Sequence, residues 1–353
     1  MILRADDEKL TYSGRIDYED KEAPVFIYPC SSIRVRVSGS FIRILVSNKR
    51  AYWENWLGFI IDGRQGKMQL PENEERAVLT LAENLEDKLH DVLIFKRQDA
   101  CHTFKFYGLE VENNSLIRAS QPLPMRKIEV YGDSVSAGEV SEAVDYEGKE
   151  DPVHNGEYSN SYYSYAWMTA RKLNARIHDI AQGGVALLNG TGWFMEPDYI
   201  GMEQIYDKLQ YNPELGSVNC WDFTKYRPHL VLVAIGQNDN HPFDYMAEDY
   251  DSEKSVYWRK RYKMFVENLR RIYPKAVIIL KTTILYHHQN WDRSIEHVCR
   301  ELEDPNIYHF RYADNGCGTP GHIRIPEAER MSEELTAFIE SLGENVWKEE
   351  YGG

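Results

Sequence analysis

The residues best suited to carry chemistry lie in Lys127–Gly138, which reads KIEVYGDSVSAG. The run from Ile128 to Tyr131 is typical of a buried strand, and Gly132-Asp133-Ser134 follows where that strand should end. Reactive residues gather outside the carboxyl ends of strands in open α/β sheets. Ser134 could therefore present its hydroxyl as a nucleophile while its own N–H helps to form an oxyanion hole. Gly-Asp-Ser is also ordinary turn sequence, so this stretch alone leaves both interpretations open.

Further stretches of the same kind follow along the chain. Ala181-Gln182-Gly183-Gly184 and Gly236-Gln237-Asn238-Asp239 each come after a strand-like run, and Gly321-His322-Ile323 precedes the last amphipathic helix. Serine, glycine, asparagine and histidine thus arrive in that order, the first three each after a predicted strand. The set resembles the SGNH (GDSL-type) hydrolase superfamily over roughly residues 126–342.

The resemblance implies ester hydrolysis through an acyl-enzyme, with Ser134 as the nucleophile and His322 as the base that takes its proton. The N–H groups of Ser134 and Gly183 and the side-chain amide of Asn238 would form the oxyanion hole. Each residue also has a plainer interpretation. Gly183 could be a turn glycine, Asn238 could belong to a loop that caps the next helix, and His322 is one of eleven histidines.

About 120 residues of strand-like sequence precede the hydrolase part. Residues 33–37 alternate apolar and polar side chains, as a half-buried strand does. Further strand-like runs follow between turn sequences, at 41–46, 57–61, 76–81, 92–95 and 102–107. Short strands at this spacing predict a β-sandwich. A β-sandwich joined to an SGNH hydrolase is similar to carbohydrate esterase family 2, whose members remove acetyl groups from plant polysaccharides. The role of the sandwich stays open between a carbohydrate-binding or substrate-shaping module and a structural cover or oligomerisation surface, and Trp53 and Trp56 could either stack on sugar or pack in its core.

The sequence departs from the superfamily at one place. SGNH enzymes usually carry an aspartate three residues before the histidine, and Thr319 stands there. Some family 2 carbohydrate esterases work with a serine–histidine pair whose imidazole is oriented by a main-chain carbonyl. We therefore expect a backbone acceptor near Thr319 to orient His322, with Asp314 or Asp292 as the alternatives.

Three regions are expected: a β-sandwich domain over 1–112, a linker over 113–125 that contains Pro122 and Pro124, and an SGNH hydrolase domain over 126–353. In the third region, predicted helices at 159–173, 256–273, 294–302 and 326–342 alternate with predicted strands at 175–180, 229–235, 276–283 and 307–310. This alternation indicates a parallel sheet with right-handed crossovers. The resemblance implies a flavodoxin-like, three-layer α/β domain behind a jelly-roll-like sandwich.

Two insertions in the hydrolase part are longer than ordinary βα loops. Residues 135–158 are rich in Asp and Glu, which is typical of a solvated loop, although the segment starts beside Ser134 and could form a wall of the cleft. Residues 185–226 are rich in aromatic side chains and begin beside Gly183. Because loops at the active end of a sheet commonly determine specificity, we expect Trp193 or Trp221 to face a sugar.

Composition narrows the classes of partner. The formal net charge is −15 and the sequence pI is about 5.3, which disfavours nucleic acid and anionic membranes as partners.

Five scattered cysteines indicate free thiols, and the first residues lack the apolar core of a signal peptide. We therefore expect a cytoplasmic protein, with a secreted form trimmed of its leader as the alternative, and leave a homo-oligomer open. His287-His288 and the pair Asp239 and His241 lack further ligands, so we expect no metal and no cofactor.

The function predicted from these observations is removal of O-acetyl groups from an acetylated carbohydrate, expected to be xylan or xylo-oligosaccharides. Two alternatives stand beside it. One is a thioesterase or lipid acyl esterase of the same superfamily, and the other is a carbohydrate-binding protein with a vestigial hydrolase site.

Overall fold

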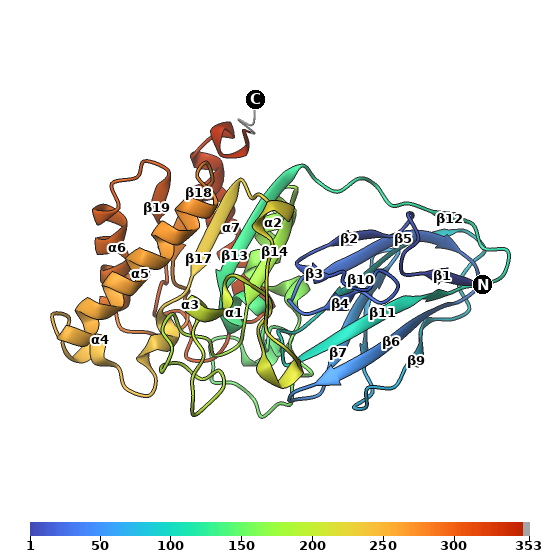
Figure 1. The fold of residues 1–353 in the computed structure, drawn as a ribbon, viewed down its shortest axis with the longest axis horizontal. Coiled ribbons are helices and arrows are strands. Elements are labelled where there is room, and N and C mark those ends of the chain that lie inside the picture. The colour runs from blue at the N-terminus through green and yellow to red at the C-terminus, as the bar shows by residue number, and fades with distance from the viewer. Residues whose placement is uncertain (349–353) are drawn as a thin grey trace.

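Antiparallel strands build the first domain of the computed structural model, which describes residues 1–348 (Figure 1). One sheet contains β1 (Ile2–Arg4), β3 (Ile16–Asp17), β4 (Val25–Phe26), β6 (Ile42–Arg50), β9 (Ala77–Ala82) and β11 (His102–Glu110). The other contains β2 (Thr11–Ser13), β5 (Ser32–Ser38), β7 (Trp56–Ile61), β8 (Arg64–Gln69), β10 (Leu89–Lys96) and β12 (Ile117–Arg118). The predicted β-sandwich is therefore confirmed.

Side-chain alternation explains how these strands pack. In β5, Ile33, Val35 and Val37 are buried in the sandwich core, whereas Arg34 and Arg36 point away from that core. Successive side chains of a strand face opposite sides, so one face of each sheet can be apolar throughout.

The segment between the domains is less irregular than expected. Ile117 and Arg118 form β12, which pairs antiparallel with Val37 and Arg36 of β5. A short strand therefore lies within the expected linker, because the apolar Ile117 is buried against the sandwich core. The remaining residues pass from β12 to the start of the second domain (Figure 1).

A parallel sheet forms the centre of the second domain. Its strands are β13 (Arg126–Gly132), β14 (Ala175–Ala181), β17 (Leu230–Ala234), β18 (Val277–Lys281) and β19 (Ile307–His309), in the spatial order β14-β13-β17-β18-β19. Numbered along the chain, this is the flavodoxin-like order 2-1-3-4-5, whose ligand site lies where the winding reverses, at the carboxyl ends of the first and third strands. The predicted three-layer α/β domain is confirmed.

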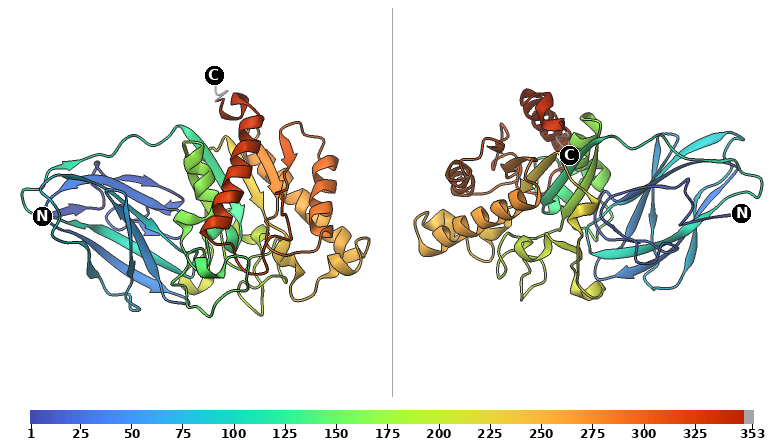
Figure 2. Two further views of the ribbon diagram at one scale, coloured as in Figure 1. Left: turned by 180° about the vertical axis from the view of Figure 1, so that it is seen from behind. Right: turned by 45° about the horizontal axis from the view of Figure 1, so that its top comes forward.

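Helices cover both faces of this sheet (Figures 1 and 2). Helices α2 (Tyr165–Lys172) and α7 (Ile325–Ser341) pack on one face, and α5 (Glu253–Ile272) and α6 (Asn290–Glu301) pack on the other. The strands are apolar on both sides, as expected for a sheet that is buried between helices. The shorter elements are α1 (Ser134–Ala137), α3 (Met202–Ile205), α4 (Tyr245–Glu248), β15 (Lys208–Gln210) and β16 (Asn219–Cys220), together with 3-10 turns at Val144–Tyr146, Ser161–Tyr163, Pro213–Leu215, Phe223–Lys225, Gln237–Asn240 and Glu344–Trp347.

The two domains are joined by buried polar contacts as well as by the chain. Arg15 of the sandwich is fully buried, and its guanidinium donates to Glu129 Oε1 on β13 at 3.1 Å and to the carbonyls of Tyr206 and Lys208, each at 2.8 Å. Cys30 of the sandwich places its thiol 3.4 Å from Asp179 Oδ2 on β14. These contacts hold the sandwich against one edge of the parallel sheet.

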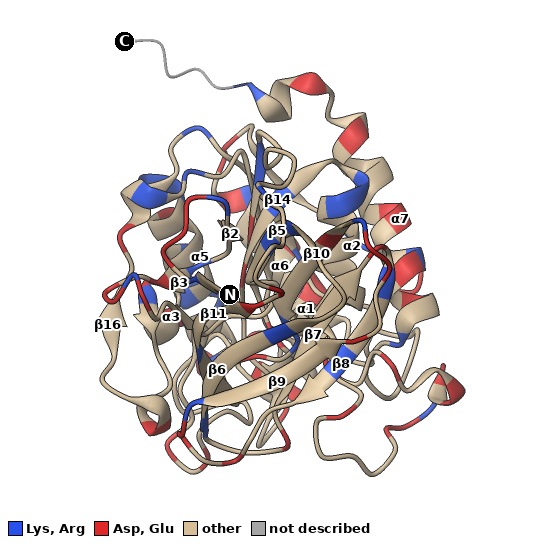
Figure 3. Cartoon of the chain, turned by 90° about the vertical axis from the view of Figure 1, so that its right-hand side faces the viewer, with Lys and Arg blue, Asp and Glu red and all other residues tan. Residues whose placement is uncertain are grey.

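The surface carries the excess of negative charge. Figure 3 shows acidic positions along α7, of which Glu333 and Glu340 are exposed. Within residues 1–348, none of the helices has the length and apolar character that crossing a bilayer requires. Residues 349–353 of the expected hydrolase domain lie outside the part of the chain that the structure describes.

Candidate active site

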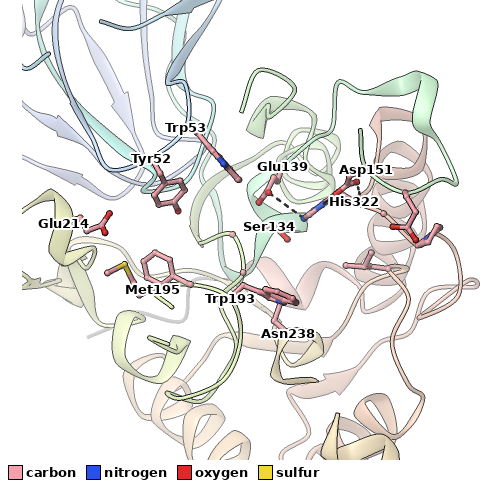
Figure 4. A pocket seen from close by; sticks show the side chains of 17 residues that line it. Tyr52, Trp53, Ser134, Glu139, Asp151, Trp193, Met195, Glu214, Asn238 and His322 are labelled. Atoms are coloured by element: carbon pink, nitrogen blue, oxygen red, sulfur yellow. Dashed lines mark hydrogen bonds and ion pairs between the residues drawn. The ribbon is translucent and has the colours of Figure 1, made fainter. Parts of the chain in front are cut away.

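Ser134 lies where β13 ends and the short helix α1 begins. The side chain of Asp133 caps α1 by accepting the N–H of Val135 at 3.0 Å, which turns the chain sharply at the serine. Gly132 allows this turn, because a Cβ at that position would lie 2.1 Å from Ser136 Oγ. Ser134 is 4% exposed and lines an open cavity of about 580 Å³ at the carboxyl end of the sheet (Figure 4).

His322 lines the same cavity and is held by Asp151 from two directions (Figure 4). Its Nδ1 lies 2.5 Å from Asp151 Oδ2, and its backbone N–H donates to Asp151 Oδ1 at 2.8 Å. Arg324, which is fully buried, donates to the same Oδ1 at 2.8 Å and fixes the carboxylate in turn. A carboxylate on Nδ1 leaves Nε2 as the nitrogen that can take a proton from a nucleophile.

The prediction of which group orients the His322 ring is therefore wrong. No main-chain carbonyl near Thr319 accepts from the ring, and the buried Thr319 hydroxyl has no hydrogen-bond partner within residues 1–348. Asp314 is exposed and lies outside the cavity lining. Asp292 is also excluded, because its Oδ2 pairs with His287 Nε2 at 3.1 Å.

Asp151 was missed because no local spacing connects it with the histidine. It comes from the acidic insertion, 171 residues before His322. Gly321 is the residue that permits their approach, since a Cβ there would lie 2.4 Å from the carbonyl oxygen of Lys149 and 2.7 Å from Asp151 Oδ1. The one sequence feature that pointed to it was the position of the insertion, which starts beside Ser134 and does form a wall of the cavity through Glu139, Glu150 and Asp151.

A second carboxyl group faces the other ring nitrogen. Glu139 Oε1 lies 3.9 Å from His322 Nε2, and burial raises the pKa of Glu139 to about 7. Burial by itself would lower the pKa of His322, but the charge of Glu139 and the hydrogen bond and charge of Asp151 outweigh it and raise that pKa to about 9. Burial by itself would raise the pKa of Asp151, but the hydrogen bond from His322 Nδ1 holds that pKa well below its usual range.

The three residues of the expected oxyanion hole, Ser134, Gly183 and Asn238, line the same cavity. Asn238 Nδ2 donates to the carbonyl of Val185 at 3.1 Å and to Asp133 Oδ2 at 3.4 Å. The N–H of Gly183 donates to Asp99 Oδ2 at 2.6 Å, so both of these donors have acceptors within the protein and their oxyanion roles stay predictions. Asp99 comes from the sandwich, after β10, which is why the hydrolase motif alone did not reveal it.

The two tryptophans of the aromatic insertion lie in different places. Trp193 lines the cavity, is 56% exposed and stacks on the ring of His241 with centroids 3.3 Å apart. Asp239 holds this segment by accepting the N–H groups of Leu187 and Leu188 at 2.7 and 3.1 Å. Trp221 is the incorrect candidate, because it is 8% exposed and packs over the guanidinium of Arg15 at the domain interface, away from the cavity.

The sandwich contributes directly to the cavity. Tyr52 and Trp53, in the loop between β6 and β7, line it opposite the hydrolase residues (Figure 4). The loop is fixed by Gln98, which accepts the N–H of Trp56 at 2.7 Å and donates to the carbonyl of Glu54 at 3.0 Å. The sandwich therefore forms part of the cavity wall. Within residues 1–348, no group of three or more His, Cys, Asp or Glu side chains is arranged to hold a metal ion.

Comparison with known proteins gives relatives along the whole chain. Residues 12–120 match the family model described as "Carbohydrate esterase 2 N-terminal". Cellulase/esterase CelE of Acetivibrio thermocellus is 28% identical over 350 residues, which are 95% of this chain but only 40% of CelE. The acetylxylan esterase / glucomannan deacetylase of Cellvibrio japonicus is 28% identical over 348 residues, covering 96% of this chain and 90% of that protein.

Solved structures agree with the sequence matches. A family two carbohydrate esterase from Clostridium thermocellum in complex with cellohexaose superimposes with a TM-score of 0.79 at 25% identity, covering 96% of this chain and all of that chain. The family two carbohydrate esterase from Cellvibrio japonicus gives the same TM-score at 23% identity, covering 98% of each chain. In sequence and in fold, across both of its domains, the chain resembles carbohydrate esterase family 2.

Proposed function

We propose that the protein is a serine esterase that removes O-acetyl groups from carbohydrates through an acetyl-enzyme on Ser134. The observation that carries the proposal is the meeting of Ser134, His322 and Asp151 at one cavity, at the point of the sheet where α/β folds place their reactive groups. The resemblance to carbohydrate esterases supports the same reaction class.

The first half of the reaction forms the acetyl-enzyme. Neutral His322 takes the proton of Ser134 Oγ at Nε2 as the oxygen attacks the acetyl carbonyl, and Asp151 stabilises the resulting imidazolium through Nδ1. The negative charge that develops on the carbonyl oxygen is stabilised by donors from residues that line the cavity, namely the N–H groups of Ser134 and Gly183 and the side-chain amide of Asn238. The imidazolium then returns its proton to the departing sugar oxygen, which leaves with a free hydroxyl group.

The second half restores the serine. Water enters the open cavity, His322 removes its proton, and the hydroxide attacks the acetyl carbonyl of the acyl-enzyme. Collapse of the tetrahedral intermediate breaks the bond to Ser134 Oγ, which takes the proton back from His322. The products are acetate and the unmodified enzyme.

Acetylated xylan or xylo-oligosaccharides are the substrates that we favour. The cavity is bordered by Trp53, Tyr52 and Trp193, whose flat apolar faces suit the rings of sugars. The curated relative named acetylxylan esterase / glucomannan deacetylase extends the choice to glucomannan.

The test measures acetate released from acetylated xylo-oligosaccharides and acetylated glucomannan fragments, with butyryl and octanoyl esters as comparison substrates. Wild-type enzyme should release acetate from the sugars and cleave the long-chain esters poorly, and Ser134→Ala should abolish both reactions. Faster cleavage of octanoyl esters than of any acetylated sugar would favour a lipid esterase instead. Sugar binding without acetate release would indicate a binding protein.

A further inference from the structure

A second large cavity lies between the domains, away from Ser134. Its volume is about 510 Å³, within the range of small-molecule sites. The sandwich lines it through β2, β5, β7 and β10, and the second domain through α2 and the first residues of β14. Residues 120–124 of the connecting segment also contribute to its wall. The first residues of β14 line this cavity, whereas Gly183 and Gly184, just past the carboxyl end of β14, line the catalytic cavity. The two cavities therefore lie at opposite ends of the sheet.

This cavity is basic in a protein that is strongly acidic. Its charged lining consists of Arg34, Arg171, Arg176 and one carboxylate, Asp91. That carboxylate is already engaged by Arg36, whose Nε lies 2.9 Å from Asp91 Oδ1. The lining therefore carries a local positive excess against a whole-chain net charge of −15.

The three arginines of this cavity lack acidic partners. Within residues 1–348, no Asp or Glu side chain pairs with Arg34, Arg171 or Arg176, and the Nε atoms of Arg34 and Arg176 are buried without a hydrogen-bond acceptor. Arg171 stacks on the ring of Tyr162 at 3.8 Å and donates to the carbonyl of Tyr162 at 2.7 Å. Keeping a guanidinium partly buried and unpaired costs stability, so a ligand that supplies the missing acceptors would be favoured.

We propose that this interdomain cavity binds a monosaccharide-sized anion, a sugar bearing a carboxylate or a phosphate. The planar fork of arginine suits both groups because it can donate two parallel hydrogen bonds to their oxygens. Serine hydroxyls at Ser13, Ser32 and Ser120 line the same space and can meet the hydroxyl groups of a sugar. The site takes residues from both domains, so an occupant also bridges them.

Isothermal titration calorimetry on the full chain tests the proposal with glucuronate, glucose 6-phosphate and glucose. We expect one of the anionic sugars to bind and uncharged glucose not to bind. Binding of glucuronate alone identifies a carboxylate site, and binding of glucose 6-phosphate alone identifies a phosphate site. Equal heats for all three sugars, or binding by none up to tens of millimolar, would overturn the proposal.

Variants locate the binding. Arg34→Met and Arg176→Met each remove a charge while keeping an apolar stem. Each should lower the affinity for the anionic sugar by about tenfold or more. Arg64→Met, an exposed change in the same sandwich, is the matched control and should bind as the wild type does. Unliganded Arg34→Met and Arg176→Met should keep or raise the melting temperature, since the arginines lack partners. Undiminished binding by both variants, or a fall in their melting temperature with no effect on binding, would contradict a ligand site.

Discussion

At the scale of single residues, the account depends on two carboxyl groups on either side of one imidazole. Asp151 is bonded to Nδ1 of His322, and Glu139 lies 3.9 Å from Nε2, the nitrogen that must receive the proton of Ser134. A protonated histidine cannot act as a base. The charges that position His322 therefore also set the pH at which it can work.

The first prediction concerns that pH. Since the pKa of His322 is raised to about 9, the neutral base is scarce at pH 7 and kcat/KM should climb as pH rises through about 9. Glu139→Gln removes a negative charge beside Nε2, which lowers the pKa of His322 and should move this rise to lower pH. The measurement is kcat/KM for an aryl acetate against pH. Glu150→Gln, which lines the same cavity in an exposed position, is the control, and an equal displacement in both variants would argue against a specific role for Glu139.

The second prediction concerns Asn238. Its Nδ2 lies in the cavity with Ser134, so Asn238→Ala should lower kcat by roughly 10²–10³ while the protein remains folded, the usual effect of losing one oxyanion donor. Steady-state kinetics and circular dichroism of the variant provide the check. Unchanged turnover would mean that Asn238 only holds the carbonyl of Val185 and the carboxylate of Asp133 in place.

At the scale of elements, the walls of the catalytic cavity come from loops that lie far apart in sequence. The acidic insertion supplies Asp151, the aromatic insertion supplies Trp193, and the loop between β6 and β7 of the sandwich supplies Trp53. None of these loops forms part of the parallel sheet, which only fixes the points from which they start.

The third prediction separates the two tryptophans of the aromatic insertion. Trp193→Ala should lower kcat/KM for acetylated xylo-oligosaccharides by roughly tenfold, the equivalent of about 1.4 kcal/mol. It should leave kcat/KM for a small aryl acetate nearly unchanged. The reason is that Trp193 is exposed at the cavity, where only a sugar is large enough to stack. Trp221→Ala should instead lower the melting temperature, because that ring is buried over Arg15. Equal losses on both substrates in Trp193→Ala would indicate collapse of the insertion.

Sequence reasoning reached the sheet and its helices because their signals are local. The apolar runs that became β13, β17 and β18 and the turn after each of them can be recognised within a few residues. Asp151 and Asp99 could not be found in this way, since each reaches the site through a tertiary contact from another loop or domain. Trp53 was a candidate for stacking on sugar, but only the docking of the sandwich brings it to the cavity. Trp221 failed for the related reason that aromatic residues in an insertion are as well suited to an interface as to a substrate wall.

At the scale of the whole molecule, the sandwich forms part of the candidate active site. It provides Tyr52 and Trp53 to the cavity, and its Asp99 accepts the N–H of Gly183 beside the serine. The position of these groups depends on how the sandwich docks. Arg15 secures that docking through Glu129 on β13, the strand next to the edge strand β14.

The fourth prediction tests the docking. Arg15→Met leaves the fully buried carboxylate of Glu129 without its charged partner, so it should lower the free energy of unfolding by roughly 3–5 kcal/mol. Urea denaturation followed by fluorescence measures this change. The double variant Arg15→Met/Glu129→Gln removes the orphaned charge and should recover part of the loss. A single variant as stable as the wild type would show that the pair does not hold the domains together.

The central claim is that Asp151 orients His322, and the most direct measurement is kcat for Asp151→Asn, with Asp314→Asn as the exposed control. Losing the acid of a catalytic triad costs about 10⁴ in kcat, so the kcat of Asp151→Asn should fall by that order while its circular dichroism stays that of the folded wild type. Its melting temperature should fall, because the buried Arg324 loses its charged partner. Asp314→Asn should keep full activity. A folded Asp151→Asn enzyme that retains kcat to within tenfold would contradict the account and restore a serine–histidine pair.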